Sequence, residues 1–416
     1  MKTPRISVLA TALLLAACGN ADTNAGTNAG DATNEAAAPA AAAGTPAKTT
    51  ANTGAFTAWK DPPAAPAVPS PAFFSHEVAT FDEPWAMAFL PDGRLLVTEK
   101  KGRLKLYDIA ANRTSEIAGV PAVDYGGQGG LGDVALHPQF AENHRVYLSY
   151  AEAGEGDTRG AALARAKLDL DADGNGGRLS DLQVIWRQVP KVTGQGHYSH
   201  RILFDRDGKL WLASGERQKF TPAQDMRANL GKVLRLNDDG TAAADNPFAD
   251  KGGVTAQIWS LGPRNILGMA FDAQGRLWEV EHGPRGGDEL NRVERGSNYG
   301  WPVVSWGNHY DGRDIPDHDT RPEFNAPEAW WNPVIAPAGF IIYSGDLFPY
   351  FKGNGFIGGV GSNSLVRIQF DGDNAREVER YDMGARIREV EQGPDGAIWL
   401  LQDGDGARLL KLTPAG

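Results

Sequence analysis

The sequence predicts an all-β fold, a six-bladed β-propeller with four-stranded antiparallel blades. Three observations carry this prediction: a hairpin motif recurs along the chain, helical periodicity is scarce, and turn-forming residues are abundant. The 416 residues include 51 glycines and 26 prolines, while 41% are hydrophobic. Frequent turns beside enough apolar residues for a sizeable core exclude a coiled coil and a chain that is disordered throughout.

Each hairpin copy consists of a short apolar strand, an Asp-Gly type of turn, and a second, alternating strand. Six copies occur, the last two weaker, at residues 88–97, 203–212, 270–279, 391–400, 135–150 and 348–360. Radial repetition of small antiparallel sheets is how a propeller avoids long exposed edges, and six blades fit the length. A pair of β-sandwiches explains the count less well and remains the alternative.

The N-terminus has the pattern of an export signal. Lys2 and Arg5 precede an apolar run, residues 6–17, that is too short to span a bilayer as a helix but suits a signal peptide. The run ends in Leu-Ala-Ala-Cys18, which resembles a bacterial lipobox. We therefore expect residues 1–18 to be a lipoprotein-type signal peptide lipidated at Cys18. An ordinary secretory signal that contains a cysteine is the alternative.

Two further expectations follow from this leader. Since Gly19 rather than aspartate follows the cysteine, we expect a periplasmic protein anchored to the outer membrane. Cys18 is the chain's one cysteine, which excludes an intramolecular disulfide framework and a cysteine-built metal site.

Composition divides the rest of the chain. Residues 19–70 are rich in Ala, Thr, Gly, Asn and Pro, which predicts a disordered tether. Residues 71–416 are predicted to form the propeller domain.

The net charge of −11 argues against nucleic acid as a partner and against an anionic membrane surface, so membrane contact is expected through the lipid anchor only. The oligomeric state is not set by the sequence.

Two loops before predicted strands carry groups suited to catalysis. His197 lies in the glycine-rich segment 194–201, where a neutral imidazole can act as a general base. A hydrogen-bonded structural histidine is the alternative. Arg264 and Asn265 offer a fork of hydrogen-bond donors for carbonyl or carboxylate oxygens, although a loop salt bridge is an equal reading.

Two other segments suggest a cation and an anion. The acidic, glycine-rich residues 281–289, with 296–302 after them, can direct carbonyl and carboxylate oxygens at calcium. Arg386 and Arg388 fall on the same side of an extended chain, which suits a polyanionic ligand. A solvated strand face is the alternative for this pair.

In their order along the chain, these segments resemble the soluble pyrroloquinoline-quinone (PQQ) sugar dehydrogenases, that is, the glucose/sorbosone dehydrogenase family and its aldose sugar dehydrogenase branch. The resemblance runs from Phe81 to Leu412. It implies a six-bladed propeller that oxidises an aldose sugar at C1 to the lactone. It also implies PQQ and calcium as cofactors and an external electron acceptor.

The resemblance also implies roles for individual residues. His197 matches the general base, and Glu216 stands where an acidic residue orients that base. The implied cofactor contacts are Gln128, Arg264, Asn265, Arg386 and Arg388. The main-chain oxygens of Gly283 and Pro284 match ligands of the cofactor's calcium, whereas Glu289 and the carbonyl of Tyr299 resemble ligands of a second, structural calcium.

Two positions depart from the family pattern. Gly361 stands where many members have a lysine that pairs with the cofactor, and His200 stands where glycine is frequent. Neither change removes a group that the chemical step requires. The remaining alternatives are a metal-dependent lactonase-type propeller and a non-catalytic propeller that binds a carbohydrate or a protein partner.

Overall fold

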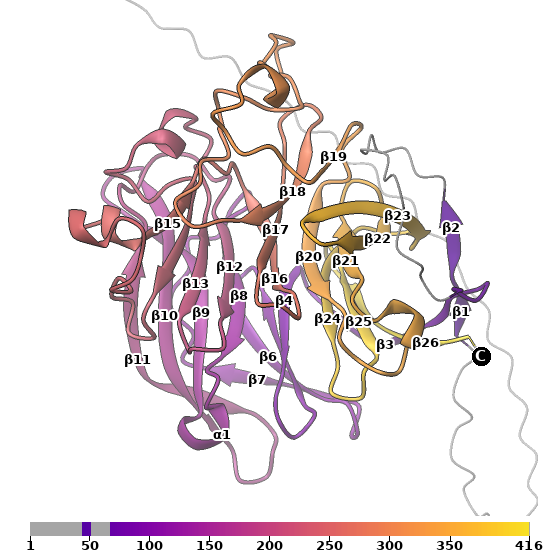
Figure 1. The fold of residues 1–416 in the computed structure, drawn as a ribbon. Coiled ribbons are helices and arrows are strands. Elements are labelled where there is room, and N and C mark those ends of the chain that lie inside the picture. The colour runs from indigo at the N-terminus through magenta and orange to yellow at the C-terminus, as the bar shows by residue number, and fades with distance from the viewer. Residues whose placement is uncertain (1–43, 51–66, 416) are drawn as a thin grey trace, which may run out of the picture. The chain divides into compact units, whose positions relative to one another are not determined.

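Antiparallel strands organise almost all of the chain that the structure, a computed structural model, describes: residues 44–50 and 67–415 (Figure 1). The single α-helix among these residues is α1 (Phe140–Asn143). Short 3₁₀ turns occupy η1 (Thr221–Gln224), η2 (Ala249–Lys251), η3 (Thr255–Gln257), η4 (His318–Thr320) and η5 (Pro349–Phe351). The all-β prediction is confirmed.

The strands form five sheets. The largest has the order β4-β5-β6-β7-β11-β10-β9-β8, with β4 (Pro84–Phe89), β5 (Leu95–Glu99), β6 (Arg103–Asp108), β7 (Arg113–Ala118), β8 (Leu131–Leu136), β9 (Arg145–Ala153), β10 (Arg159–Leu170) and β11 (Gly177–Arg187). Two four-stranded sheets follow chain order: β12 (Ser199–Phe204), β13 (Leu210–Ser214), β14 (Lys232–Leu236) and β15 (Ile258–Leu261), then β16 (Ile266–Phe271), β17 (Leu277–Glu281), β18 (Asp288–Val293) and β19 (Ala329–Trp331).

The last two sheets each take a strand from the N-terminal region. One has the order β2-β23-β22-β21-β20, with β2 (Lys48–Thr50), β20 (Pro337–Ile342), β21 (Gly355–Gly359), β22 (Ser364–Asp371) and β23 (Asn374–Asp382). The other has the order β1-β3-β26-β25-β24, with β1 (Thr45–Pro46), β3 (Phe73–Phe81), β24 (Ile387–Gln392), β25 (Ile398–Gln402) and β26 (Ala407–Pro414).

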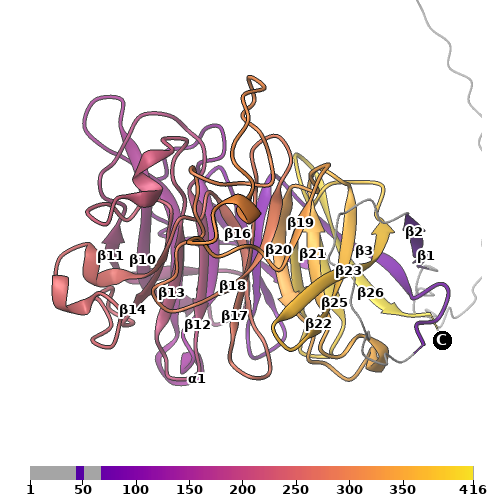
Figure 2. The same ribbon diagram turned by 45° about the horizontal axis from the view of Figure 1, so that its top comes forward.

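A ring of strands connects these sheets. The largest sheet is two four-stranded meanders, β4 to β7 and β8 to β11, joined by a short parallel pairing of β7 with β11. The first strands of successive groups, β4, β8, β12, β16, β20 and β24, contact one another in that order, and β24 also contacts β4. The long connection from β18 to β19, in orange, projects beyond the strand ends (Figure 2).

The predicted hairpins lie at the start of these groups. The four clear copies coincide with the pairs β4/β5, β12/β13, β16/β17 and β24/β25. Two boundaries differ from the prediction. In the copy at residues 135–150 the connection folds into α1, and in the copy at 348–360 the strand that precedes the turn is β20, which ends at Ile342. Local patterning cannot place a strand across so long a connection.

The hydrophobic core lies between neighbouring sheets. Every residue of β5 and of β13 is buried, because each strand has a packed sheet on both of its faces. One cluster joins Trp278 and Trp331 to Phe340 and Ile357 of the next sheet. This two-sided burial explains why the sequence combines high turn content with a sizeable core.

The expected tether contains two strands. β1 and β2, which fall within residues 19–70, pair with β3 and β23 at two sheet edges. Backbone pairing at an open edge needs no large apolar side chain, so composition gave no sign of it. The predicted signal peptide and Cys18 lie outside the described residues. No helix among the described residues is long and apolar enough to cross a bilayer.

An aspartate fixes the turn between β12 and β13. Asp205 Oδ1 accepts the backbone N–H groups of Asp207 and Lys209, at 3.0 and 2.8 Å. Its Oδ2 accepts the indole N–H of buried Trp211 at 2.9 Å. Gly208 completes the turn at φ +74°, a conformation that other residues adopt with strain.

Removal of this carboxylate should destabilise the fold. Asp205→Ala leaves the Trp211 indole and two backbone N–H groups without partners, so we expect the free energy of unfolding to fall by about 2–3 kcal/mol. Asp207→Ala in the same turn removes only an exposed carboxylate and should change it by less than about 0.5 kcal/mol. Denaturant titration of both variants measures the difference; equal losses would contradict the assigned role of Asp205.

Candidate active site

The ring of first strands brings distant loops to one cavity of about 310 Å³. Because the first strands of successive meanders run in the same direction, the residues that begin them gather at one end of the ring. Six lining residues lie at or just before these six strand starts: Trp85, Gln128, Ser199, Asn265, Ala336 and Arg386. This topology explains how residues far apart in the sequence converge.

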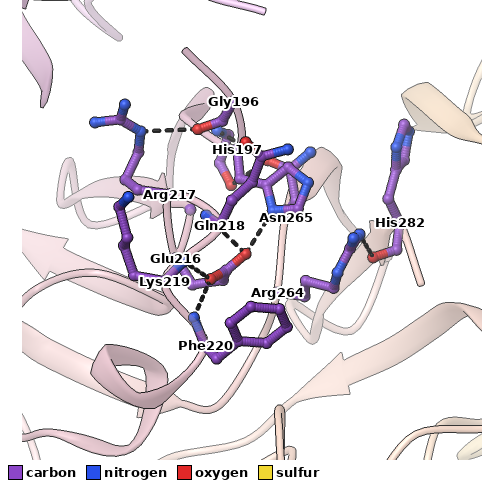
Figure 3. Close-up of polar contacts among 12 residues, drawn as sticks. Gly196, His197, Glu216, Arg217, Gln218, Lys219, Phe220, Arg264, Asn265 and His282 are labelled. Atoms are coloured by element: carbon purple, nitrogen blue, oxygen red, sulfur yellow. Dashed lines mark hydrogen bonds and ion pairs between the residues drawn. The ribbon is translucent and has the colours of Figure 1, made fainter. Parts of the chain in front are cut away.

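His197 lies two residues before β12 and hydrogen-bonds Glu216 (Figure 3). The distance from its Nδ1 to Glu216 Oε1 is 2.5 Å, and both side chains are buried. The backbone N–H of His197 donates to Gln128 Oε1 at 2.7 Å. Since a carboxylate only accepts, Nδ1 carries the proton and Nε2 keeps its lone pair in the neutral ring.

Burial and hydrogen bonding set the charges of this pair. Desolvation lowers the pKa of His197, and the opposing interaction with Glu216 does not fully offset it. Burial alone raises the pKa of Glu216, but hydrogen bonds, first the one from His197, hold it below its ordinary value. The pair therefore consists of a neutral imidazole and a carboxylate at neutral pH.

A tight loop after β13 fixes the Glu216 carboxylate. Its Oε2 accepts the backbone N–H groups of Lys219 and Phe220, at 2.6 and 2.7 Å, and its Oε1 accepts that of Gln218 at 3.0 Å. Residues 217, 218 and 220 have positive φ, so the backbone curls around the carboxylate. The carboxylate cannot turn away from the imidazole without breaking these bonds.

Arg217 is a site residue that the sequence did not reveal. Its guanidinium is buried, lies 3.8 Å from the ring centroid of Tyr198, and donates to the carbonyls of Gly194 and Gly196 at 2.5 and 2.8 Å. It thereby holds the loop that carries His197. The sequence pointed to the adjoining Glu216 as a site residue. It could not show that the Arg217 side chain turns toward the His197 loop, because that depends on the tertiary fold.

Arg264 and Asn265 lie just before β16. Both of their backbone N–H groups donate to Glu281 Oε2, at 2.5 and 3.1 Å. The Arg264 guanidinium donates to the carbonyls of His282 and Gly283, at 2.9 and 2.7 Å. Its Nε is buried without a hydrogen-bond partner among the described residues. Glu281 is thus a further positioning group that sequence reasoning had not singled out.

Asn265 faces the first cavity together with the predicted arginine pair. Arg386 and Arg388 both line it and both bind Asp403, with Nε–O distances of 2.7 and 2.8 Å. The expectation that they share one side of the chain is confirmed. Burial opposes ionisation of Asp403, but the two guanidinium groups keep its pKa low. Asp403, which no motif indicated, offsets part of their charge.

A second cavity, of about 280 Å³, lies on the other side of the same loops. His197 and Arg264 line it, whereas their sequence neighbours Tyr198 and Asn265 line the first cavity. Tyr310, on the projecting β18–β19 connection, forms an exposed aromatic wall of the second cavity. The His197 and Arg264 loops therefore lie between the two cavities.

The four residues that the resemblance divides between two calcium ions lie together. Gly283, Pro284, Glu289 and Tyr299 all line one small void of about 10 Å³, which is the size of a single small ion or water. The carbonyl of Gly283 already accepts from Arg264. No group of three or more His, Cys, Asp or Glu side chains in the described part of the chain is arranged to hold an ion.

Buried carboxylates cluster beside this void, with His318 3.3 Å from Glu289 and the charge of Arg264 acting on Glu281. Asn291 Nδ2 lies 2.8, 3.4 and 3.3 Å from oxygens of Glu279, Glu281 and Glu289, and this amide is neutral. Burial, and then repulsion between the carboxylates, raises the pKa of Glu279 and Glu281 well above ordinary values. Glu279 Oε2 and Asn291 Oδ1 have no hydrogen-bond partner among the described residues. The cluster therefore places unpaired, buried oxygens close to the void.

Comparison with known proteins identifies the family. A family model described as Glucose / Sorbosone dehydrogenase matches residues 81–411. The chain is 39% identical over 341 residues to the aldose sugar dehydrogenase YliI of Escherichia coli (strain K12), which covers 80% of this chain and 90% of that protein.

Solved structures agree with this match. The apo form of the soluble aldose sugar dehydrogenase from Escherichia coli superposes with a TM-score of 0.77 at 38% identity, over 82% of this chain and 99% of that one. The PQQ-bound aldose sugar dehydrogenase of Streptomyces coelicolor superposes with a TM-score of 0.69 at 28% identity, over 84% and 99% of the two chains. The protein therefore belongs to the glucose/sorbosone dehydrogenase family, as the order of its sequence motifs indicated.

Proposed function

We propose that this protein oxidises aldose sugars at C1 to the lactone, with PQQ and calcium as cofactors, and passes the electrons to an external acceptor. The observation that carries the proposal is the buried pair of His197 and Glu216, which presents an unprotonated imidazole nitrogen at the second cavity, beside the loop that also borders the first. Membership of the family and the PQQ-bound relative from Streptomyces coelicolor support it.

His197 acts as the general base in this proposal. Its Nδ1 is occupied by Glu216, so Nε2 accepts the proton of the sugar's C1 hydroxyl group. Glu216 remains ionised and stabilises the imidazolium that forms. The loop that binds the Glu216 carboxylate keeps the imidazole in one orientation. The second cavity, with its aromatic wall at Tyr310, holds the sugar ring.

The first cavity fits a planar polyanion such as PQQ. Arg386, Arg388 and Lys100 line it with positive charge, against the two carboxylates of Asp403 and Glu83 in the same lining. The amides of Gln128 and Asn265 supply neutral hydrogen bonds. These residues would hold the cofactor, whereas Arg264, which the resemblance also assigns to it, lines the second cavity. When bound, the quinone supplies a two-electron acceptor for the hydride of C1. Gly361 also lines this cavity without adding a charge, so the arginine pair and Lys100 supply the positive charge there.

Calcium is proposed on the four residues around the small void. The carbonyl oxygens of Gly283 and Pro284 would hold the cofactor's calcium, and the carboxylate of Glu289 with the carbonyl of Tyr299 a second, structural one. The void has room for one ion, and the nearby Glu281 would add charge. Cation binding would relieve the repulsion among the buried carboxylates. The void lies next to Arg264, so the ion would also fix the loop that carries this arginine.

The architecture and location complete the proposal. The closed ring of six first strands, each followed by its own antiparallel meander, supports six four-stranded blades. The lipobox-like sequence that ends at Cys18 supports an anchor at the outer membrane, with the domain in the periplasm. Residues 1–18 are then the signal peptide. The segment between Cys18 and the first propeller strand links the propeller domain to the lipid anchor.

Replacement of the base should abolish turnover. His197→Ala removes the proton acceptor, so we expect kcat to fall about 10³-fold or more while PQQ still binds. The assay is dye reduction by protein supplied with PQQ, calcium and an aldose. His76→Ala on β3, which removes only a hydrogen bond to Thr413, should keep full activity. Retained turnover in His197→Ala would remove His197 from the base role.

Calcium should stabilise the protein as well as activate it. An ion that binds only the folded state at 100 times its dissociation constant adds about 2.7 kcal/mol, so chelation should lower Tm by several degrees. Calcium should restore Tm, and magnesium should do so much less. Glu289→Gln should lose most of this calcium response. A melting curve that chelation leaves unchanged would contradict the calcium site.

A further inference from the structure

His200, on β12, is the buried side chain of the first cavity that has no polar partner. The residue is 2% exposed, and neither ring nitrogen has a hydrogen-bond partner among the described residues. A neutral imidazole carries one N–H donor and one acceptor, and each costs free energy when it is buried unpaired. The side chain is therefore destabilising as the protein stands without a ligand.

The backbone at His200 adds to this cost. Its φ is +75°, in the left-handed region that glycine adopts freely and other residues adopt with strain. The adjacent Ser199, at φ +63°, and the base His197, at φ +52°, share this conformation. Strain of this kind gathers at functional sites, where a ligand or a reaction makes use of it.

Packing alone does not account for the histidine. Its ring stacks on Tyr198 with centroids 5.3 Å apart at 10°, and meets the edge of Trp85 at 5.8 Å. A Cβ added at Gly132 would lie 2.6 Å from its Cγ, so that glycine leaves room for the ring. These contacts would serve an apolar ring equally well, without the two unpaired nitrogens.

The cavity is where the missing partner can come from. His200 lines the first cavity together with Asn265, Arg386 and Arg388. Burial and the charges of Arg217 and Arg201 lower its pKa to about 3, so the ring is neutral and offers one donor and one acceptor. Such a group complements the in-plane nitrogen and oxygen atoms of a flat aromatic acid.

We infer that His200 is a ligand contact of the first cavity, where its imidazole hydrogen-bonds the edge of a bound planar aromatic acid. The inference rests on the proposed function, in which that ligand is PQQ. It explains why a strained, unpaired histidine stands where glycine would fit the backbone. Stability is lost in the free protein and regained when the ligand is bound.

Binding measurements on the protein without cofactor test this inference. The probe is PQQ with calcium, titrated by fluorescence, since Trp85 lies beside His200. His200→Gly removes the strain and the unpaired nitrogens but also the ring that packs on Tyr198 and Trp85, so PQQ affinity rather than Tm is the decisive measurement for this variant. Loss of one hydrogen bond should weaken PQQ binding by about fivefold or more.

Two further variants make the result specific. His200→Phe keeps a ring against Tyr198 but has no polar atom, and should weaken binding to a similar degree. His144→Gly is the matched control, because His144 also has positive φ, +54°, but lies at the end of α1 outside the cavity. It should relieve strain and leave PQQ affinity unchanged.

The affinity of the variants decides the inference. If His200→Gly and His200→Phe bind PQQ as tightly as the parent protein, His200 is a packing residue and the inference is wrong. If the parent protein itself does not bind PQQ with calcium, the proposed cofactor and this inference are both wrong. Weaker binding by the two His200 variants alone, with His144→Gly unaffected, supports it.

Discussion

The hydrogen bond between His197 and Glu216 is the interaction on which the rest of the site depends. It fixes which imidazole nitrogen carries the proton, and burial keeps the ring neutral. The surrounding groups keep that hydrogen bond in place. Three backbone N–H groups donate to the Glu216 carboxylate, and the Arg217 side chain donates to the loop that carries His197. A desolvated base of this kind needs a rigid support, because a small displacement would return it to solvent.

The fold supplies that rigidity. Strands buried on both faces close into a ring, and their starts deliver one loop each to the same cavity. The sequence predicted this part well, since Asp-Gly turns and alternating strands are local signals. It also predicted that His197 and Arg264 lie in polar loops just before strands. The resemblance divided Gly283 and Pro284 from Glu289 and Tyr299 as ligands of two calcium ions, whereas in the structure all four line one small void.

The remaining features of the fold and the site depend on tertiary contacts that no local sequence pattern encodes. Asp403 joins Arg386 and Arg388 only after β24 and β25 pair, and β1 and β2 add to sheet edges through backbone bonds alone. The sequence showed His200 as a departure from the family but could not show that its ring would be buried and unpaired. The role of such a group depends on the residues that pack around it in the folded protein.

The pH dependence of kcat/KM for aldose oxidation tests the central claim most directly. A base whose pKa is lowered by burial stays unprotonated below pH 6.5, so the acid limb of the parent protein should lie below that value. In Glu216→Gln, the carboxylate that raises the pKa of His197 is gone, so the limb should move to still lower pH and the plateau should fall. An acid limb above pH 6.5, or one that Glu216→Gln leaves in place, would contradict the account.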